Sequence, residues 1–462
     1  MWARMRSVWR LLRALRLFSV IFVEYLVQMG LERVFGEARL VARWRRVHRR
    51  NARRLYRGIL RLRGVYIKMG QVLSVMGSFL PRAYAEELES LQDHVPPRPF
   101  SDVERAFLAA HGKTPQVIFD HFEPVPLAAA SLGQVHRARL RGETVAVKIL
   151  YPNIAKIIRL DLRVLRWAMR VYSWFVPMAR LERVIEQLQD LLERETNLEH
   201  EAKCLERIAR NFKGQDDILF PKVYWELTTR NILVMSFMEG IKISHTNELR
   251  AAGIDPDQVA RRLTESFYQQ LFLDGFFHAD PHPGNFLVQP GPKLVVLDFG
   301  AVSEVRWNLV DGMLDILRGM FAKDDRLVIK GIETMGFLAA DGNRELLERT
   351  VRQYFQKLLL VQIDDFGKIK GETVKRLADP GVEKHELREL MRSVEYPDGW
   401  FFVERSVVIL FGLVAKMAPK VNTVQVGFPY IMKLLAMKQV EQAAAAAVTS
   451  SQPALKPVAE SA

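Results

Sequence analysis

Two aspartates and an asparagine lie at a spacing that suits phosphoryl transfer. Asp280 precedes Asn285 by five residues in the segment from His278 to Asn285, and Asp298 follows thirteen residues later in Asp298-Phe299-Gly300. A carboxylate can accept a substrate proton, while an amide oxygen and a second carboxylate can hold Mg²⁺ on phosphate oxygens. We therefore expect Asp280 to be catalytic and Asn285 and Asp298 to bind metal, with ATP and Mg²⁺ as cofactors.

Two simpler explanations of these residues are a turn and a different metal site. Asp-Phe-Gly is common in turns because Gly permits positive φ. His278, Asp280 and His282 could bind a metal from one loop, but the segment offers no obvious fourth ligand. The spacing favours the phosphotransferase, because the apolar run from Leu294 to Leu297 is typical of a buried strand that would deliver Asp298.

A lysine at the end of a predicted hairpin supplies a cation for the same site. Residues 135–140 and 144–150 alternate as two strands joined at Arg141-Gly142-Glu143, and Lys148 lies near the end of the second strand. A small-residue loop and one fixed cation are what nucleotide phosphates need, although an ordinary strand-end lysine is the alternative. The loop expected to lie over the phosphates contains Ala128, Ala129, Ala130, Ser131 and Gly133.

The elements around this hairpin complete a predicted two-lobed architecture. A long helical region, residues 154–212, is expected to supply one acid that pairs with Lys148. Residues 222–227 and 231–237 are predicted strands of a five-stranded small lobe, and Met238 begins the crossing to a helical lobe. The chain is predicted to be helical beyond Asp298 to about residue 446 and to end in a disordered tail.

The net charge is concentrated at one end of the chain. Residues 1–63 contain 17 Arg, three Glu and no Lys, which accounts for the whole net charge of +14, so the remaining chain is neutral. The single cysteine, Cys204, excludes an intramolecular disulfide and suits a reducing compartment. No run of 18 uncharged apolar residues occurs, which argues against membrane spans; the longest candidates are residues 17–31 and 400–414.

The basic N-terminal arm predicts contact with an anionic membrane. Residues 2–23 mix arginines with bulky apolar side chains, among them Trp2, Trp9 and Phe18, as in a helix that lies in a membrane interface. An arginine-rich organelle presequence and a solvated basic helix are the alternatives. No recognised motif accompanies the second basic stretch, residues 39–63, so we expect no nucleic acid.

These motifs resemble the UbiB/AarF family of atypical protein-kinase-like proteins over about residues 60–440. Lys68-Met69-Gly70-Gln71 matches its Lys-x-Gly-Gln signature, residues 128–134 its Ala-rich loop, and residues 278–285 its modified catalytic loop. The resemblance implies that Lys68 and Gln71 act at the active site on a helix over the peptide site. It also implies ATPase activity in isoprenoid-quinone metabolism and nucleotide-site roles for Lys148, Glu195, Glu201 and Met238.

One departure from the family concerns Asn197. The family carries Glu-x-Asp before the paired glutamate, and the matching positions here are Glu195 and Asn197. The loss of this carboxylate removes any salt bridge or metal contact that the aspartate makes with the signature helix.

The predicted fold class is α+β, a two-lobed protein-kinase-like fold with an added N-terminal helical subdomain. Its predicted parts are a basic arm (1–54), a helical extension (55–116), a kinase-like N-lobe with inserted helices (117–240), a C-lobe (241–446) and a disordered tail (447–462). The expected partners are an anionic membrane surface, lipid or quinone precursors and quinone-biosynthesis proteins, and a homodimer is compatible with the sequence. The expected location is cytoplasmic, on the inner face of a membrane, or the mitochondrial matrix side if the N-terminus is a presequence. A small-molecule phosphotransferase and a nucleotide-sensing scaffold without turnover are the alternative functions.

Overall fold

The residues predicted for the site lie mainly in the first of two units of this computed structural model. It describes residues 2–62, 64–67, 69–70, 82–89, 97–129, 132–173, 189, 192–339, 341–359, 393–395 and 397–450. The first unit comprises Met1–His245, Ala279–Val302 and Glu404–Ile409, and the second comprises Thr246–His278, Ser303–Val403 and Leu410–Ala462.

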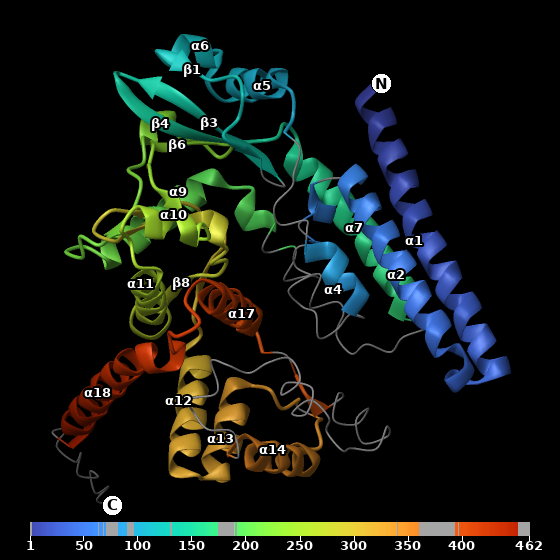
Figure 1. Ribbon diagram of the computed structural model, residues 1–462, viewed down its shortest axis with the longest axis vertical. Coiled ribbons are helices and arrows are strands. Elements are labelled where there is room, and N and C mark those ends of the chain that lie inside the picture. Colours follow the sequence, from blue (N-terminus) through green and yellow to red (C-terminus); the bar gives the residue numbers. More distant parts are fainter. Residues whose placement is uncertain are drawn as a thin grey trace, which may run out of the picture. The chain divides into compact units, whose positions relative to one another are not determined.

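The first unit combines N-terminal helices with two β-sheets. Its helices are α1 (Trp2–Phe35), α2 (Glu37–Leu62), α4 (Arg82–Glu89), α5 (Phe100–His111), α6 (Pro115–Ile118), α7 (Ile154–Ser173) and α9 (Leu198–Asn211). Its strands are β1 (His121–Phe122), β2 (Ala128–Ala129), β3 (Gly133–Leu140), β4 (Glu143–Leu150), β5 (Ile218–Leu219), β6 (Ile232–Ser236), β7 (Ile241–Lys242), β9 (Phe286–Gln289) and β10 (Lys293–Val296). Helices α1, α2 and α7 lie side by side (Figure 1).

A five-stranded antiparallel sheet places Lys148. Its order is β1-β3-β4-β6, with β2 also paired to β3, and Lys148 lies opposite Val135 and Leu233. Helix α5 packs on this sheet (Figure 1), where Phe107 joins a buried apolar cluster with Val147 and Val234. The predicted hairpin is confirmed, because alternate residues of β3 and β4 are buried in that cluster.

A four-stranded sheet places the aspartates. Its order is β5-β10-β9-β7, and β9 and β10 form a hairpin between Asn285 and Asp298. The predicted buried strand before Asp298 is confirmed as β10, whose Leu294 to Val296 are buried. The two site residues therefore lie at the same end of one antiparallel hairpin.

One predicted strand of the small lobe was wrong. Residues 222–227 form no strand: Val223 makes one isolated bridge with Met235, and residues 225–227 form the 3-10 turn η2. The alternation fails because both Trp225 and Glu226 are exposed. The described part of the predicted helical region 154–212 contains α7 and α9, and Asn197 is the extended N-cap residue before α9.

The second unit is mainly helical. Its elements are α10 (Thr246–Ala251), α11 (Pro256–Tyr268), the π-helical turn η3 (Gln269–Leu273), β8 (Phe276–His278), β11 (Val302–Glu304), α12 (Trp307–Ala322), α13 (Asp325–Met335), α14 (Arg344–Leu359), α17 (Trp400–Met417) and α18 (Thr423–Ser450). Two of these elements, β11 and α17, contribute residues to both units. Helices α12 and α13 pack closely, as do α11 and α18.

Candidate active site

Lys148 is held between two carboxylates that are distant in the sequence. Its Nζ atom lies 2.7 Å from Oε1 of Glu201, on α9, and 2.9 Å from Oδ2 of Asp298, after β10. The Glu201 side chain is only 2% exposed, and its Oε1 atom also accepts from the backbone N–H of Phe299 at 3.5 Å. The predicted pairing of Lys148 with an acid of this region is therefore present, and it joins three separate elements.

Burial and charge act in opposite directions on this cluster. Burial alone would lower the pKa of the Lys148 amine, but the carboxylates of Asp298 and Glu201 outweigh it and raise that pKa. Burial is the largest effect on the Glu201 carboxyl and raises its pKa, whereas attraction to Lys148 lowers it. The resulting pKa is about 7. The Lys148 ammonium thus faces Asp298 and a Glu201 carboxyl whose pKa is raised.

The raised pKa of Glu201 predicts a particular pH dependence of stability. The folded carboxyl binds a proton more tightly than the unfolded one, whose ordinary pKa is 4.5, so its contribution is present below 4.5 and is lost as pH rises towards 7. Glu201→Gln carries no such proton. Urea unfolding at pH 5 to 8 should show the wild-type stability falling relative to the variant up to about pH 7 and then levelling. A difference that does not change with pH would contradict this assignment.

Asp280 contacts a buried arginine that the sequence analysis did not select. Nη2 of Arg405, on α17, lies 2.8 Å from Oδ2 of Asp280, and the Arg405 side chain is 5% exposed. Its Nε and Nη1 atoms are buried without a hydrogen-bond partner among the described residues. The two residues are 125 positions apart, and the only signal of Arg405 is its charge within a long apolar helix.

Asn285 is fixed by the same loop. Its Nδ2 donates to the backbone oxygen of Asp280 at 3.0 Å, which leaves its Oδ1 as the side-chain atom suited to a cation. Asp298 accepts the Gly300 N–H on Oδ1 at 2.9 Å, as an aspartate in a tight turn does. Both residues offer hard oxygen ligands, which Mg²⁺ prefers together with phosphate oxygens and water.

The alternative metal site receives no support in the described part of the chain. No group of three His, Cys, Asp or Glu side chains there could hold a metal ion. Nδ1 of His282 instead accepts the Gly284 N–H at 3.2 Å and so caps the short turn η4 (Pro283–Asn285). A Mg²⁺ ion needs no such cluster, because it is commonly held by one or two carboxylates and substrate phosphates.

Three of the predicted nucleotide-site residues, Ala128, Ala129 and Gly133, lie in the same five-stranded sheet as Lys148. Ala128 and Ala129 form β2 against Gln134 and Val135. A Cβ at Gly133 would overlap the backbone oxygen of Ile149, so close packing favours glycine at this position whether or not a nucleotide binds. Met238 is half-buried after β6. Lys68, Gln71, Ala130 and Ser131 lie outside the described residues.

Glu195 and Asn197 have different surroundings. The Cγ atom of Glu195 lies 3.7 Å from where a Cβ on Gly300 would be, so Glu195 borders the turn after Asp298. Asn197 is the N-cap of α9, and its Oδ1 accepts the His200 N–H at 3.3 Å. Asn and Asp are equally good N-caps, so this contact survives the departure from the family pattern.

Comparisons with known proteins identify the family. Residues 90–332 match the ABC1 atypical kinase-like domain, which is more than half of the chain. The chain belongs to the ABC1 atypical kinase-like family. The predicted resemblance and the predicted kinase-like fold with added N-terminal helices are therefore confirmed.

Several ABC1-family proteins are similar over most of this chain. It is 31% identical over 415 residues to Activity of BC1 complex kinase 8, chloroplastic, of Arabidopsis thaliana, covering 84% of this chain and 54% of that protein. It is also 31% identical to the uncharacterized protein sll0095 of Synechocystis sp., covering 83% and 68%. The chain thus spans about half the length of the Arabidopsis relatives.

A solved structure of Rv3197 with erythromycin, from Mycobacterium tuberculosis, is 23% identical to this chain. The match covers 78% of this chain and 94% of that one, with a TM-score of 0.49.

Proposed function

We propose that this ABC1-family protein binds Mg-ATP and either hydrolyses it or transfers its γ-phosphoryl group. In this proposal the activity supports the biosynthesis of ubiquinone or of another isoprenoid quinone. The observation that carries the nucleotide part is the Lys148 ammonium fixed between Glu201 and Asp298. A lysine held by a helix glutamate beside an aspartate is the arrangement that protein kinases use to position phosphates.

Each residue then has a separate task. Glu201 fixes the Lys148 ammonium, which would bind phosphate oxygens. Asp298 and Asn285 would hold Mg²⁺, which neutralises charge on the phosphates when bound. Asp280 would accept the proton of the attacking hydroxyl or water, and Arg405 would orient the Asp280 carboxylate.

The quinone part of the proposal rests on the UbiB/AarF resemblance. That resemblance also favours ATP hydrolysis over protein phosphorylation, through the Lys68 and Gln71 signature that lies outside the described residues. The proposed location is peripheral, on the inner face of a membrane; the Arabidopsis relatives are chloroplastic by name. A small-molecule phosphotransferase and a nucleotide-sensing scaffold are the competing functions.

The distribution of radiolabel from γ-³²P-ATP separates these functions. We expect free phosphate as the main product and faster release with quinone-precursor lipids, with little label in generic peptides. Lys148→Met should abolish phosphate release. Lys213 is an exposed lysine outside the cluster, so Lys213→Met should leave phosphate release unchanged. Label transferred mainly to a small molecule or a peptide would replace the ATPase assignment, and binding without turnover would indicate a scaffold.

A further inference from the structure

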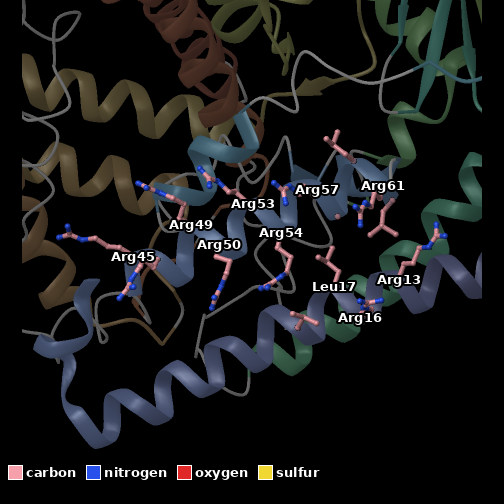
Figure 2. A pocket seen from close by; sticks show the side chains of 15 residues that line it. Arg13, Arg16, Leu17, Arg45, Arg49, Arg50, Arg53, Arg54, Arg57 and Arg61 are labelled. Carbon is pink, nitrogen blue, oxygen red and sulfur yellow. The ribbon is translucent and has the colours of Figure 1, made fainter. Parts of the chain in front are cut away.

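An arginine-lined groove lies between the first two helices. It has a volume of about 1480 Å³ and is lined mostly by arginines, with apolar residues at Leu17, Val20 and Gly58 (Figure 2). Helix α1 contributes Arg13 and Arg16; α2 contributes Arg45, Arg46, Arg49, Arg50, Arg53, Arg54, Arg57 and Arg61. The groove therefore concentrates positive charge on one surface of the first unit.

The arginines of α2 follow the helical repeat. One row has a member every four residues from Arg45 to Arg61, and a shorter row runs from Arg46 to Arg54. Four residues rise about 6 Å along a helix, so the longer row extends about 24 Å. Such a row is too long for one phosphate group, and because four residues turn about 40° beyond a full helical turn, it also winds partly around α2.

Few carboxylates offset this charge. Glu24 pairs with Arg50 and Arg54, and Glu87 pairs with Arg53. Among the described residues, no ion pair involves the other arginines of the groove, which are Arg13, Arg16, Arg45, Arg46, Arg49, Arg57 and Arg61. These cations have no protein partner there, which favours a multiply anionic ligand.

Helix α1 adds an apolar surface beside the groove. By length and composition alone, residues 9–35 suffice to cross a membrane, and only 11% of an apolar 18-residue window within this stretch is buried. Apart from Phe35, its exposed apolar residues follow one another at intervals of three, four, seven or eight, which places them on one helix face. The exposed apolar residues are Trp9, Leu12, Val20, Val23, Val27, Val34 and Phe35. Arg16 lies four residues from both Leu12 and Val20 and also lines the groove, so stripe and groove share an edge.

The opposite face of α1 packs against other helices of the first unit. Arg10 forms an ion pair with the buried Asp161 of α7 at 2.5 Å, and Tyr25 bonds with His48 of α2 at 2.8 Å. A Cβ at Gly58 would overlap Leu17, so α1 and α2 approach closely there. Phe18 is half-buried, and its ring lies 6.3 Å from that of the buried Tyr66.

We infer that α1 and α2 form a docking surface for an anionic bilayer, on which α1 lies in the plane of the membrane. The arginines of the groove bind lipid phosphates, and the exposed stripe of α1 inserts among the acyl chains. A spanning α1 would have to expose the polar contacts of its inner face to lipid, including the Arg10–Asp161 pair. Duplex nucleic acid could match the charge but leaves the apolar stripe unexplained.

Vesicle flotation of the full-length protein tests the charge part. Arg45→Gln/Arg49→Gln/Arg57→Gln should lower binding to phosphatidylglycerol-containing vesicles about tenfold or more. Arg139→Gln/Arg250→Gln/Arg326→Gln removes the same charge from exposed sites elsewhere and should change binding less than about twofold. Val23→Glu/Val27→Glu should remove the binding that persists at high salt. Equal losses of vesicle binding by the two arginine triples would overturn the proposal. So would a groove triple that loses binding to duplex DNA but keeps its binding to vesicles.

Probe depth tests the orientation. Single cysteines at Leu12, Val23 and Val34, in a Cys204→Ala background, carry a fluorophore that is quenched by lipids labelled at known depths. Residues 12 and 34 are about 33 Å apart along a helix, close to the thickness of the hydrocarbon core. An in-plane α1 gives three equal, shallow depths. A probe at position 23 that lies deeper than the other two would show a spanning helix and contradict the proposal.

Discussion

Replacing Asp298 with Asn should remove the Mg²⁺ dependence of ATP binding. The carboxylate is both the expected metal ligand and a partner of Lys148 at 2.9 Å. The attraction between two unit charges 4 Å apart is about 4 kcal/mol at an effective dielectric constant of 20, which corresponds to roughly a thousandfold in affinity. Calorimetric titration with ATP in Mg²⁺ and in EDTA should therefore show a large difference for the wild type and almost none for the variant.

A matched control separates this effect from a general change of charge. Asp216 is exposed and lies outside the cluster, so Asp216→Asn should bind Mg-ATP as the wild type does. Lys148 remains in Asp298→Asn and keeps its contact with Glu201. Weak metal-independent binding of ATP is therefore expected to persist. Tight Mg-dependent binding by Asp298→Asn would exclude Asp298 as the metal ligand.

Asp280→Asn should destabilise the protein by about 3–5 kcal/mol, because it leaves the buried guanidinium of Arg405 without its counter-charge. Arg405→Met alone should also destabilise it, since the Asp280 carboxylate then loses its ion pair with Arg405. The double variant should recover much of the loss, because neither charge remains. Urea unfolding of the four proteins gives the coupling free energy directly.

The exposed pair of Arg306 and Asp398, 3.2 Å apart, is the control for this cycle. An ion pair in solvent contributes about 0–1 kcal/mol, so Asp398→Asn should scarcely change stability. If Asp280→Asn cost no more than Asp398→Asn, or if the double variant lost the sum of the single losses, Arg405 would have no specific role in holding Asp280.

Local pattern predicted those parts of the site that depend on spacing. The hairpin before Lys148 and the strand before Asp298 follow from short-range alternation of apolar residues, and the structure contains both as β4 and β10. The approach of Glu201 to Lys148 depends on tertiary packing, and the family resemblance, not the helix periodicity, selected that glutamate among several on the same segment.

Other features had no local signal. Arg405 is one of three charged residues in a mainly apolar helix, and its contact with Asp280 depends on how distant segments pack. The helical region predicted for residues 154–212 had no assigned boundary at Asn197, where the structure begins α9 with Asn as a good N-cap. The strand expected at residues 222–227 failed because exposed Trp225 and Glu226 interrupt the alternation. The apolar stripe of α1 was not predicted as one continuous surface, because Arg16 and Glu24 interrupt the uncharged run on which the prediction rested.

Turnover by the Asp280→Asn variant tests the central claim most directly. Phosphate release from Mg-ATP would be measured for the wild type and the variant on the same anionic vesicles, after calorimetry has shown that both bind Mg-ATP. Loss of a positioned general base lowers the rate about 10²–10⁴-fold, so the variant should retain at most about one per cent of the wild-type rate. Equal rates in the two proteins, with equal nucleotide binding, would show that Asp280 does not perform the chemistry assigned to this site.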